Sequence, residues 1–168
     1  MSEIRFRHAI LGDLPVIVDI YNSTVAGRMV TADTEPVSVQ SKINWFNEHS
    51  PDHRPLWMLE DAYENTLGWV SIQSFYGRPA YNGTTEISIY LDPGFRGKGL
   101  GKKVLSMAIE KCRALGIQTL LGFIFEHNEP SVRLFKQAGF EQWALFPNVA
   151  VLDGVERSLV ILGKRILK

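Results

Sequence analysis

The spacing of apolar and polar side chains divides the chain into segments typical of strands and helices. Residues 4–7 alternate apolar and charged side chains, as a half-buried strand does. A helix is expected to begin at Asp13, its predicted N-cap, and to carry an apolar stripe on one face. A second helix is expected from Pro36 onward. It would bury Ile43, Trp45 and Phe46.

The middle of the chain carries three strand-like runs, at residues 56–60, 67–75 and 84–91. Only the short polar turn at residues 62–65 separates the first two, which is a hairpin signal. Consecutive strands joined in this way pair antiparallel. We therefore expect a meander of antiparallel strands in this part of the chain.

The last part of the chain alternates helices and strands. A helix is expected at residues 101–115, with Gly116 as its stop. A strand at 119–124, a short helix at 131–138 and a closing strand at 158–165 should follow. Because a strand–helix–strand unit normally runs parallel, the pattern predicts a mixed α/β fold around one central sheet. No repeat or linker divides residues 1–168, so a single domain is expected.

Charge and cysteine usage narrow the class of protein. Eighteen basic and eighteen acidic side chains give no net charge, which argues against nucleic acid or an anionic membrane as the main partner. The single cysteine, Cys112, fits a reducing compartment. The apolar runs are too short for a membrane span, and the first residues lack the pattern of a signal peptide. We expect a cytoplasmic protein.

A glycine-rich loop with the sequence Arg-Gly-Lys-Gly-Leu-Gly, residues 96–101, lies between a predicted strand and a predicted helix. Glycines let backbone N–H groups approach a ligand, and a helix N-terminus favours an anion. The spacing fits neither a P-loop nor the dinucleotide-binding fingerprint. The loop therefore predicts pyrophosphate binding, with a simple glycine-rich turn as the alternative.

This loop resembles the Q/R-x-x-G-x-G/A motif of the GNAT acyltransferase superfamily. Asn128 and Ser131, followed by Gly139-Phe140, are similar to the superfamily's N-x-x-S…G-F segment. The order of these motifs covers nearly the whole chain. The resemblance implies a largely antiparallel sheet, flanked by helices, whose fourth and fifth strands splay apart.

Within the superfamily the chain most resembles the phosphinothricin and methionine-sulfone N-acetyltransferases. Three stretches carry this resemblance: Tyr21-Asn22, Thr34-Glu35-Pro36, and Arg78 to Tyr81 leading into Thr85 to Tyr90. It implies acetyl-CoA as the acyl donor and a small primary amine as the acceptor. It also implies a homodimer, in which the C-terminal strands extend the partner's sheet.

The donor site follows from the resemblance residue by residue. Backbone groups at Ile89, Tyr90 and Leu91 are expected to pair with the pantetheine, with the Leu91 N–H as the oxyanion donor. Asn128 and Ser131 are expected to contact it as well, although Asn128 also suits a turn or helix cap. The remaining expected contacts are Arg96, Gly97, Lys98, Gly99, Leu100, Gly101 and Lys102. The histidines show no metal-ligand spacing, so no metal is expected.

Glu86 is the candidate general base. Strand periodicity places Glu86, Ser88 and Tyr90 on one face, opposite the apolar residues. A carboxylate of ordinary pKa, about 4.3, is weak against a protonated amine, so it would act through water or with a raised pKa. The alternative is an ordinary surface glutamate. Where many superfamily members place a Tyr as proton donor, this chain has Phe135, and His127 or Tyr90 would be the possible substitutes.

The acceptor is expected to meet Asp33, Arg78, Tyr81, Glu86 and Ser88. Arg78 could bind a carboxylate, or it could be an ordinary turn arginine. Ala32-Asp33 replaces the Phe-Arg of phosphinothricin enzymes, which disfavours an acidic amino acid analogue and makes a cationic or neutral amine plausible. An amino-acid-like acceptor is the leading hypothesis. The alternatives are a polyamine, a peptide N-terminus, a lysine, or a non-catalytic acyl-CoA sensor.

Overall fold

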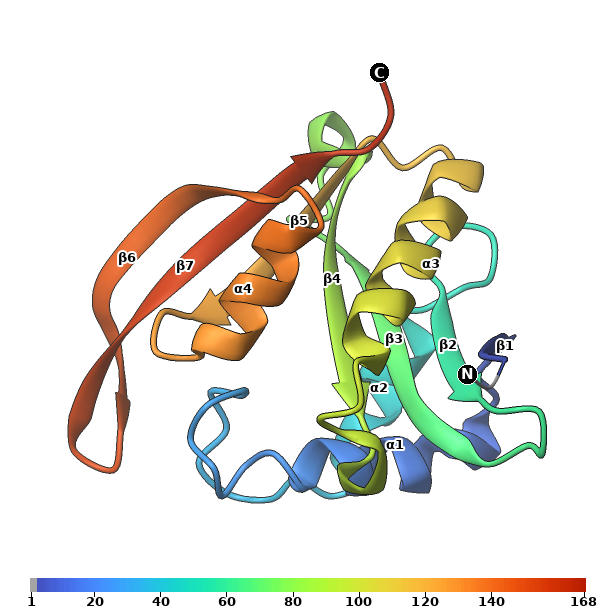
Figure 1. Ribbon diagram of the computed structural model, residues 1–168, viewed down its shortest axis with the longest axis horizontal. Helices are drawn as coiled ribbons and strands as arrows, with labels where there is room; N and C mark the ends of the chain where they lie inside the picture. Colours follow the sequence, from blue (N-terminus) through green and yellow to red (C-terminus); the bar gives the residue numbers. More distant parts are fainter. Residues whose placement is uncertain (1–2) are drawn as a thin grey trace.

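A twisted sheet of seven strands, in the order β1-β2-β3-β4-β5-β7-β6, is the centre of the computed structural model, which describes residues 3–168 (Figure 1). Helices pack on both faces of the sheet. The strands are β1 Arg5–His8, β2 Leu56–Glu60, β3 Thr66–Ser74, β4 Thr84–Leu91, β5 Thr119–Phe125, β6 Glu141–Leu152 and β7 Val155–Arg165. The α-helices are α1 Leu14–Asn22, α2 Ile43–Asn47, α3 Leu100–Ala114 and α4 Glu129–Gln137.

The pairing of β4 with β5 differs from every other pairing in this sheet. It is parallel, whereas the remaining neighbours in the described chain pair antiparallel. It is also short, since it covers only Thr84–Glu86 against Thr119–Leu121. Beyond Glu86 the two strands separate, as Figure 1 shows. The expected mixed α/β fold with splayed fourth and fifth strands is confirmed.

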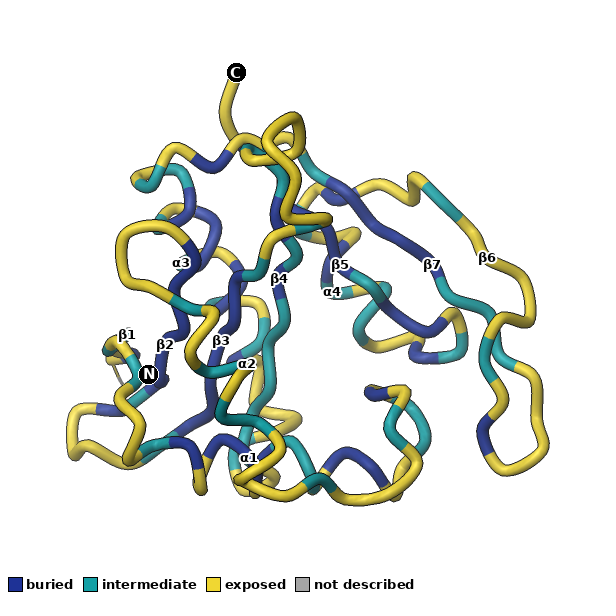
Figure 2. The backbone as a smooth tube through the Cα atoms, turned by 180° about the vertical axis from the view of Figure 1, so that it is seen from behind, coloured by how far each residue is buried: buried dark blue, intermediate teal, exposed yellow. Residues whose placement is uncertain are grey.

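Each face of the sheet belongs to its own hydrophobic cluster because side chains alternate along a strand. On β2, Trp57 and Leu59 join the cluster under α3, whereas Leu56 and Met58 join the cluster under α1. The α3 cluster includes the fully buried Val104, Leu105 and Ala108. The buried stretches of β2, β3 and α3 lie together in Figure 2.

The second helix begins later than the sequence predicted. The segment from Pro36 stays non-helical until a 3-10 turn, Gln40–Lys42, leads into the short α2. Ser38 and Ser41 bond to each other's backbone, which offers the chain a local turn in place of helix. Ile43, Trp45 and Phe46 pack against the α1 cluster but are only partly buried.

Two further predictions need correction. The sequence predicted one closing strand at 158–165, but β6 and β7 form a long hairpin that includes it. The pattern of β6 was missed because the strand is mostly exposed and its register shifts between Phe146 and Ala150. Asp13 occupies the N-cap position of α1 without capping it, because its carboxylate instead binds Arg7 and the Ile10 N–H.

Within residues 3–168, no helix combines the length and the apolar character needed to cross a membrane.

Candidate functional site

The splay of β4 from β5 exposes a strand edge. The Asp92 N–H donates to Leu67 O at 2.8 Å, so the backbone groups at this position face β3. Because successive residues of a strand point their backbone groups to alternate edges, those of Ile89 and Leu91 face β5. Pairing with β5 has already ended at Glu86. The Ile89 and Leu91 backbone groups therefore line an opening that an extended ligand can fill.

This opening is part of a groove of about 820 Å³. It runs between the end of β4, the glycine-rich loop, α4 and the loop after α1. Of the expected donor contacts, the groove is lined by Ile89, Tyr90, Leu91, Arg96, Gly97, Gly99, Gly101, Lys102 and Ser131. The structure thus brings most of the expected donor residues together.

The loop at residues 96–101 needs glycine for its backbone conformation. Gly97 and Gly99 have φ values of 72° and 76°, in the left-handed region that other residues avoid. A Cβ at either position would meet nothing within 4 Å, so space does not impose the choice. Gly99 directly precedes α3, whose N-terminus and the exposed Lys102 favour an anion there.

Arg96 holds the loop in place. Its Nε donates to Leu91 O at 3.0 Å and its Nη2 donates to Ser23 Oγ at 2.7 Å. The guanidinium therefore ties the loop to β4 and to the end of α1. Lys98 extends over the Phe95 ring, and Leu100 is buried in the α3 cluster, so neither side chain lines the groove.

The start of α4 forms the opposite wall. Asn128 is 6% exposed, and its Oδ1 accepts a hydrogen bond from the Ser131 N–H at 3.4 Å. It caps α4, while Ser131 lines the groove and Asn128 does not. Phe135 is buried, packs edge-on against Phe140 and lines the groove without a proton to donate.

His127 lines neither this groove nor the pocket described next, within the part of the chain that the structure describes. Its Nε2–H donates to Arg28 O at 2.8 Å and so ties the loop after α1 to the end of β5. The structure gives His127 a contact between two loops and no place beside the reacting groups.

A second cavity, of about 260 Å³, lies on the α1 face of β3 and β4. Its floor consists of three cross-strand pairs: Trp69–Tyr90, Ser71–Ser88 and Gln73–Glu86. The predicted common face of Glu86, Ser88 and Tyr90 is therefore the floor of a pocket. Tyr90 lines the groove as well, so the two cavities meet at this residue.

Aromatic rings form one end of this pocket. The Trp69 and Tyr90 rings stack with centroids 4.5 Å apart, and the Trp69 Nε1–H donates to Ile17 O at 3.1 Å. Trp45 meets Trp69 edge-on at 5.6 Å. The Tyr21 hydroxyl donates to the Asp33 carboxylate, and the Thr31 hydroxyl is bonded to the same Tyr21 oxygen. Asp33 is thus bound to a tyrosine that lines the pocket.

Part of this pocket was not predicted from the sequence. Trp69 and Trp45 have the pattern of core residues, and nothing marked Gln73 or Lys42. Lys42 stands three residues before Trp45, a spacing that places two helical side chains on one face. That spacing was the available signal for Lys42.

The electrostatics of the pocket favour a protonatable Glu86. Its half-buried carboxyl has a pKa raised by burial. Burial, followed by the negative surroundings, also raises the pKa of Tyr90. Burial and the bond to Asp33 raise the pKa of Tyr21 to about 12. Both tyrosines therefore stay protonated at neutral pH, which leaves Glu86 as the acidic group among the described residues that line this pocket.

Ser71 is held by a buried histidine. The His49 Nδ1–H donates to Trp45 O at 2.9 Å, which leaves Nε2 to accept from the Ser71 hydroxyl at 2.8 Å. Burial lowers the pKa of His49, which favours this neutral form. Ser71 therefore presents its oxygen to the pocket as an acceptor.

Arg78 and Tyr81 lie elsewhere. They line a separate hollow of about 360 Å³ at the connection between β3 and β4, together with Arg54. The structure does not bring them to the pocket around Glu86. Ser88 and Glu86 are the expected acceptor residues that line this pocket, with Asp33 reaching it through Tyr21.

The residues present fit acetyl-CoA. The groove combines an unpaired strand edge for an extended amide chain with left-handed glycines at a helix N-terminus for a pyrophosphate. Its end meets a smaller pocket that holds a carboxylate. Among residues 3–168, no group of three or more His, Cys, Asp or Glu side chains forms a metal site.

Comparisons with known proteins point the same way. Residues 17–140 match the family described as Acetyltransferase (GNAT) family. Over 154 residues the chain is 50% identical to YwnH of Bacillus subtilis, whose name proposes a phosphinothricin acetyltransferase; the match covers 92% of this chain and 94% of YwnH. It is 32% identical over 143 residues to the L-methionine sulfoximine/L-methionine sulfone acetyltransferase of Pseudomonas aeruginosa, covering 85% and 83%.

A solved structure agrees with the fold. The crystal structure of a phosphinothricin acetyltransferase from Sinorhizobium meliloti in complex with acetyl-CoA superposes with a TM-score of 0.90 at 28% identity. The superposition covers 99% of this chain and 90% of that one.

Proposed function

The chain belongs to the Acetyltransferase (GNAT) family and is an N-acetyltransferase, and we propose that it acetylates the primary amine of a small, amino-acid-like molecule with acetyl-CoA as donor. One observation carries this proposal. A groove suited to acetyl-CoA meets, at Tyr90, a separate small pocket that holds Glu86. Two relatives support it. One is named as an acetyltransferase of L-methionine sulfoximine and L-methionine sulfone, and the other was crystallised in complex with acetyl-CoA.

The donor is held by the groove. Its pyrophosphate would lie at Gly97, Gly99 and Gly101, and its amide chain along Ile89 and Leu91. When bound, acetyl-CoA supplies an activated thioester carbonyl and a thiol leaving group. The Leu91 N–H points into this opening, where it can donate a hydrogen bond to an oxygen on which negative charge develops.

Glu86 is the proposed general base. An attacking amine must lose a proton, and Glu86 is the carboxylate on the pocket floor. Burial raises its pKa, which makes it a stronger proton acceptor than an exposed carboxylate. Across the sheet from it, Gln73 offers an amide that can hold the acceptor or a bridging water.

The leaving group needs no proton donor from α4. A thiol has a pKa of about 8.5, so it can depart as a thiolate. Phe135 instead supplies an apolar wall that excludes water from the groove. His127, held by Arg28, is not required in this scheme.

The size of the pocket favours a small acceptor. Its volume of about 260 Å³ and its aromatic walls suit a free amino acid better than a folded protein's lysine. The test is a panel of amines, with acetyl-CoA consumption and thiol release as readouts. Amino acids and their analogues are expected to be acetylated. Acetylation of polyamines or peptides alone would contradict the acceptor class, and acetyl-CoA binding without turnover on any amine would favour a sensor.

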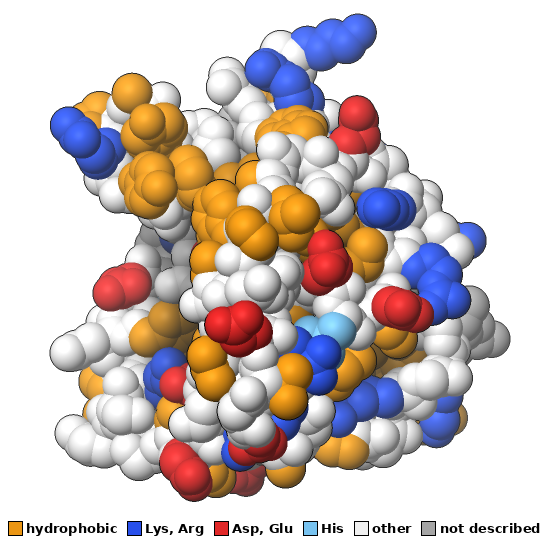
Figure 3. Space-filling model, turned by 90° about the vertical axis from the view of Figure 1, so that its left-hand side faces the viewer, with side chains coloured by type: hydrophobic (Ala, Val, Ile, Leu, Met, Phe, Trp, Pro, Cys, Tyr) orange, Lys and Arg blue, Asp and Glu red, His pale blue; other side chains and the backbone are white. Residues whose placement is uncertain are grey.

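We also propose that two copies associate through the β6–β7 hairpin. β6 is an edge strand of the sheet, and exposed strand edges invite pairing. Apolar side chains gather on this side of the molecule (Figure 3). On β6, five apolar side chains are each at least 44% exposed: Trp143, Leu145, Phe146, Val149 and Val151. Light scattering should give twice the chain mass of 19.0 kDa, and a monomer at micromolar concentration would contradict this.

A further inference from the structure

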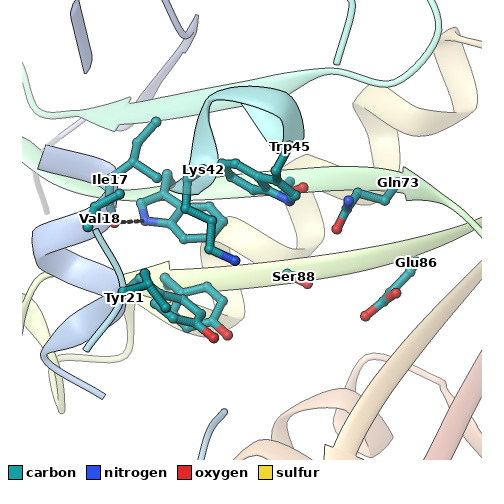
Figure 4. Close-up of a pocket in the computed structure, with 12 residues that line it drawn as sticks. Ile17, Val18, Tyr21, Lys42, Trp45, Gln73, Glu86 and Ser88 are labelled. Atoms are coloured by element: carbon teal, nitrogen blue, oxygen red, sulfur yellow. Dashed lines mark hydrogen bonds between the residues drawn. The ribbon is translucent and has the colours of Figure 1, made fainter. Parts of the chain in front are cut away.

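Lys42 brings a positive charge into the cavity of about 260 Å³ that holds Glu86, which we call the acceptor pocket. In the described residues that line this pocket, Lys42 is the only basic side chain and Glu86 the only acidic one. Lys42 is half-buried, and its Nζ lies 5.4 Å from the centre of the Tyr21 ring. In Figure 4 its side chain points into the cavity from the side opposite Glu86, with Ser88 between them. The pocket therefore has a positive and a negative end.

The two charges do not neutralise each other. No ion pair within residues 3–168 includes Lys42 or Glu86. Burial is the cause of the raised pKa of Glu86, without an opposing attraction from a nearby cation. The Asp33 carboxylate already accepts a hydrogen bond from the Tyr21 hydroxyl. Lys42 therefore holds a half-buried charge in this cavity without a carboxylate to pair with it.

We propose that Lys42 binds the carboxylate of the acceptor and so selects free amino acids over amines that lack this group. This inference rests on the proposed function. An amino acid would turn its amine toward Glu86 and its carboxylate toward Lys42. The Ser71 oxygen, whose proton is donated to His49, can accept a hydrogen bond from the amine between them.

This assignment supplies a positive charge that the sequence motifs of the acceptor site did not reveal. Asp33 alone, in place of an arginine, made a neutral or cationic amine plausible. The structure engages Asp33 with Tyr21 and places a lysine from a different segment in the cavity. The positive charge is thus supplied from the turn before α2, which agrees with an amino-acid-like acceptor that carries a carboxylate.

The decisive variant is Lys42→Gln, with Lys42→Arg as the conservative control. Each protein acetylates L-methionine sulfone and its carboxamide, two amines that differ in the carboxylate. Wild type should prefer the free acid. Lys42→Gln should lose about 10- to 100-fold in kcat/KM on the acid, mainly through KM, and less than about 3-fold on the amide. Lys42→Arg should retain most of the wild-type preference for the free acid over the amide.

A binding measurement separates recognition from chemistry. Trp45 and Trp69 line the pocket, so their fluorescence can report binding of L-methionine sulfone without acetyl-CoA. Lys42→Gln should weaken this binding by a similar factor, with an unchanged thermal midpoint. An equal loss on acid and amide, or an unchanged preference for the acid, would overturn the role of Lys42. A wild type that acetylates only amines without a carboxylate would overturn the proposed function as well.

Discussion

The groove proposed to hold acetyl-CoA, called the donor groove, and the acceptor pocket are built from different parts of the chain. The groove uses mainly backbone: an unpaired strand edge, two left-handed glycines and a helix N-terminus. The pocket uses side chains from α1, α2, β3 and β4 that lie far apart in sequence. A donor site made of backbone can keep one ligand while the pocket beside it changes its acceptor. The two regions should therefore respond separately to substitution.

Glu86→Gln should give the largest effect and should separate the turnover rate from the affinity for acetyl-CoA. This variant keeps the shape of the pocket and removes the base. The turnover rate should fall by about 100-fold or more, while the affinity for acetyl-CoA should change little. Steady-state kinetics and calorimetry measure the two quantities. An unaffected rate would remove Glu86 from its proposed role.

The converse separation is expected from Gly99→Val. At a φ of 76° a β-branched residue is strained, and the loop would lose its shape at the groove. Acetyl-CoA affinity should fall by about 30-fold, with acceptor binding retained. Gly116→Val is the matched control, because Gly116 has a φ of 78° and lies outside the groove. Equal losses of acetyl-CoA affinity in both variants would show that the effect is only one of stability.

The pH profile should show the burial of Glu86. The base must be ionised, so the rate rises with pH through its pKa. Because burial raises this pKa, the acid limb should lie above the ordinary value of about 4.3. Deprotonation of the amine adds a second limb at higher pH. Glu86→Gln should abolish the lower limb and retain the upper one, and a lower limb that persists in the variant would assign it to another group.

The smallest expected effect is on stability. Below the unfolded-state pKa, Glu86 is protonated in both states and contributes nothing. Above its raised folded-state pKa, the ionised carboxylate costs stability because it is partly desolvated. Glu86→Gln should therefore raise Tm at pH 7 by at most about 4 °C, with the gain vanishing near pH 4. A lower Tm of the variant at pH 7 would contradict the view that the ionised Glu86 carboxylate is partly desolvated and destabilising.

The same contrast explains what could be predicted from sequence. Gly97 and Gly99 are close in sequence and adopt a left-handed backbone conformation that depends on local sequence, so a phosphate-binding loop could be predicted there. The alternation along β4 similarly placed Glu86 and Ser88 on one face. Both features depend on neighbours in the chain.

The acceptor pocket depends on neighbours in space. Lys42 reaches it only because the turn before α2 packs beside α1, and local sequence does not fix that packing. Arg78 shows the converse, since a residue close to β4 in sequence lines another hollow in the fold. β6 was missed because its exposed apolar pattern lacks the alternation of a half-buried strand.

The most direct test is a crystal structure with coenzyme A and an N-acetylated amino acid. Both ligands should meet at Tyr90, with the pantetheine along Ile89 and Leu91. The acetylated nitrogen should lie within hydrogen-bond reach of Glu86, about 3 Å, or one water away. An acceptor bound at the Arg54–Arg78 hollow, with Glu86 facing no ligand, would contradict the account.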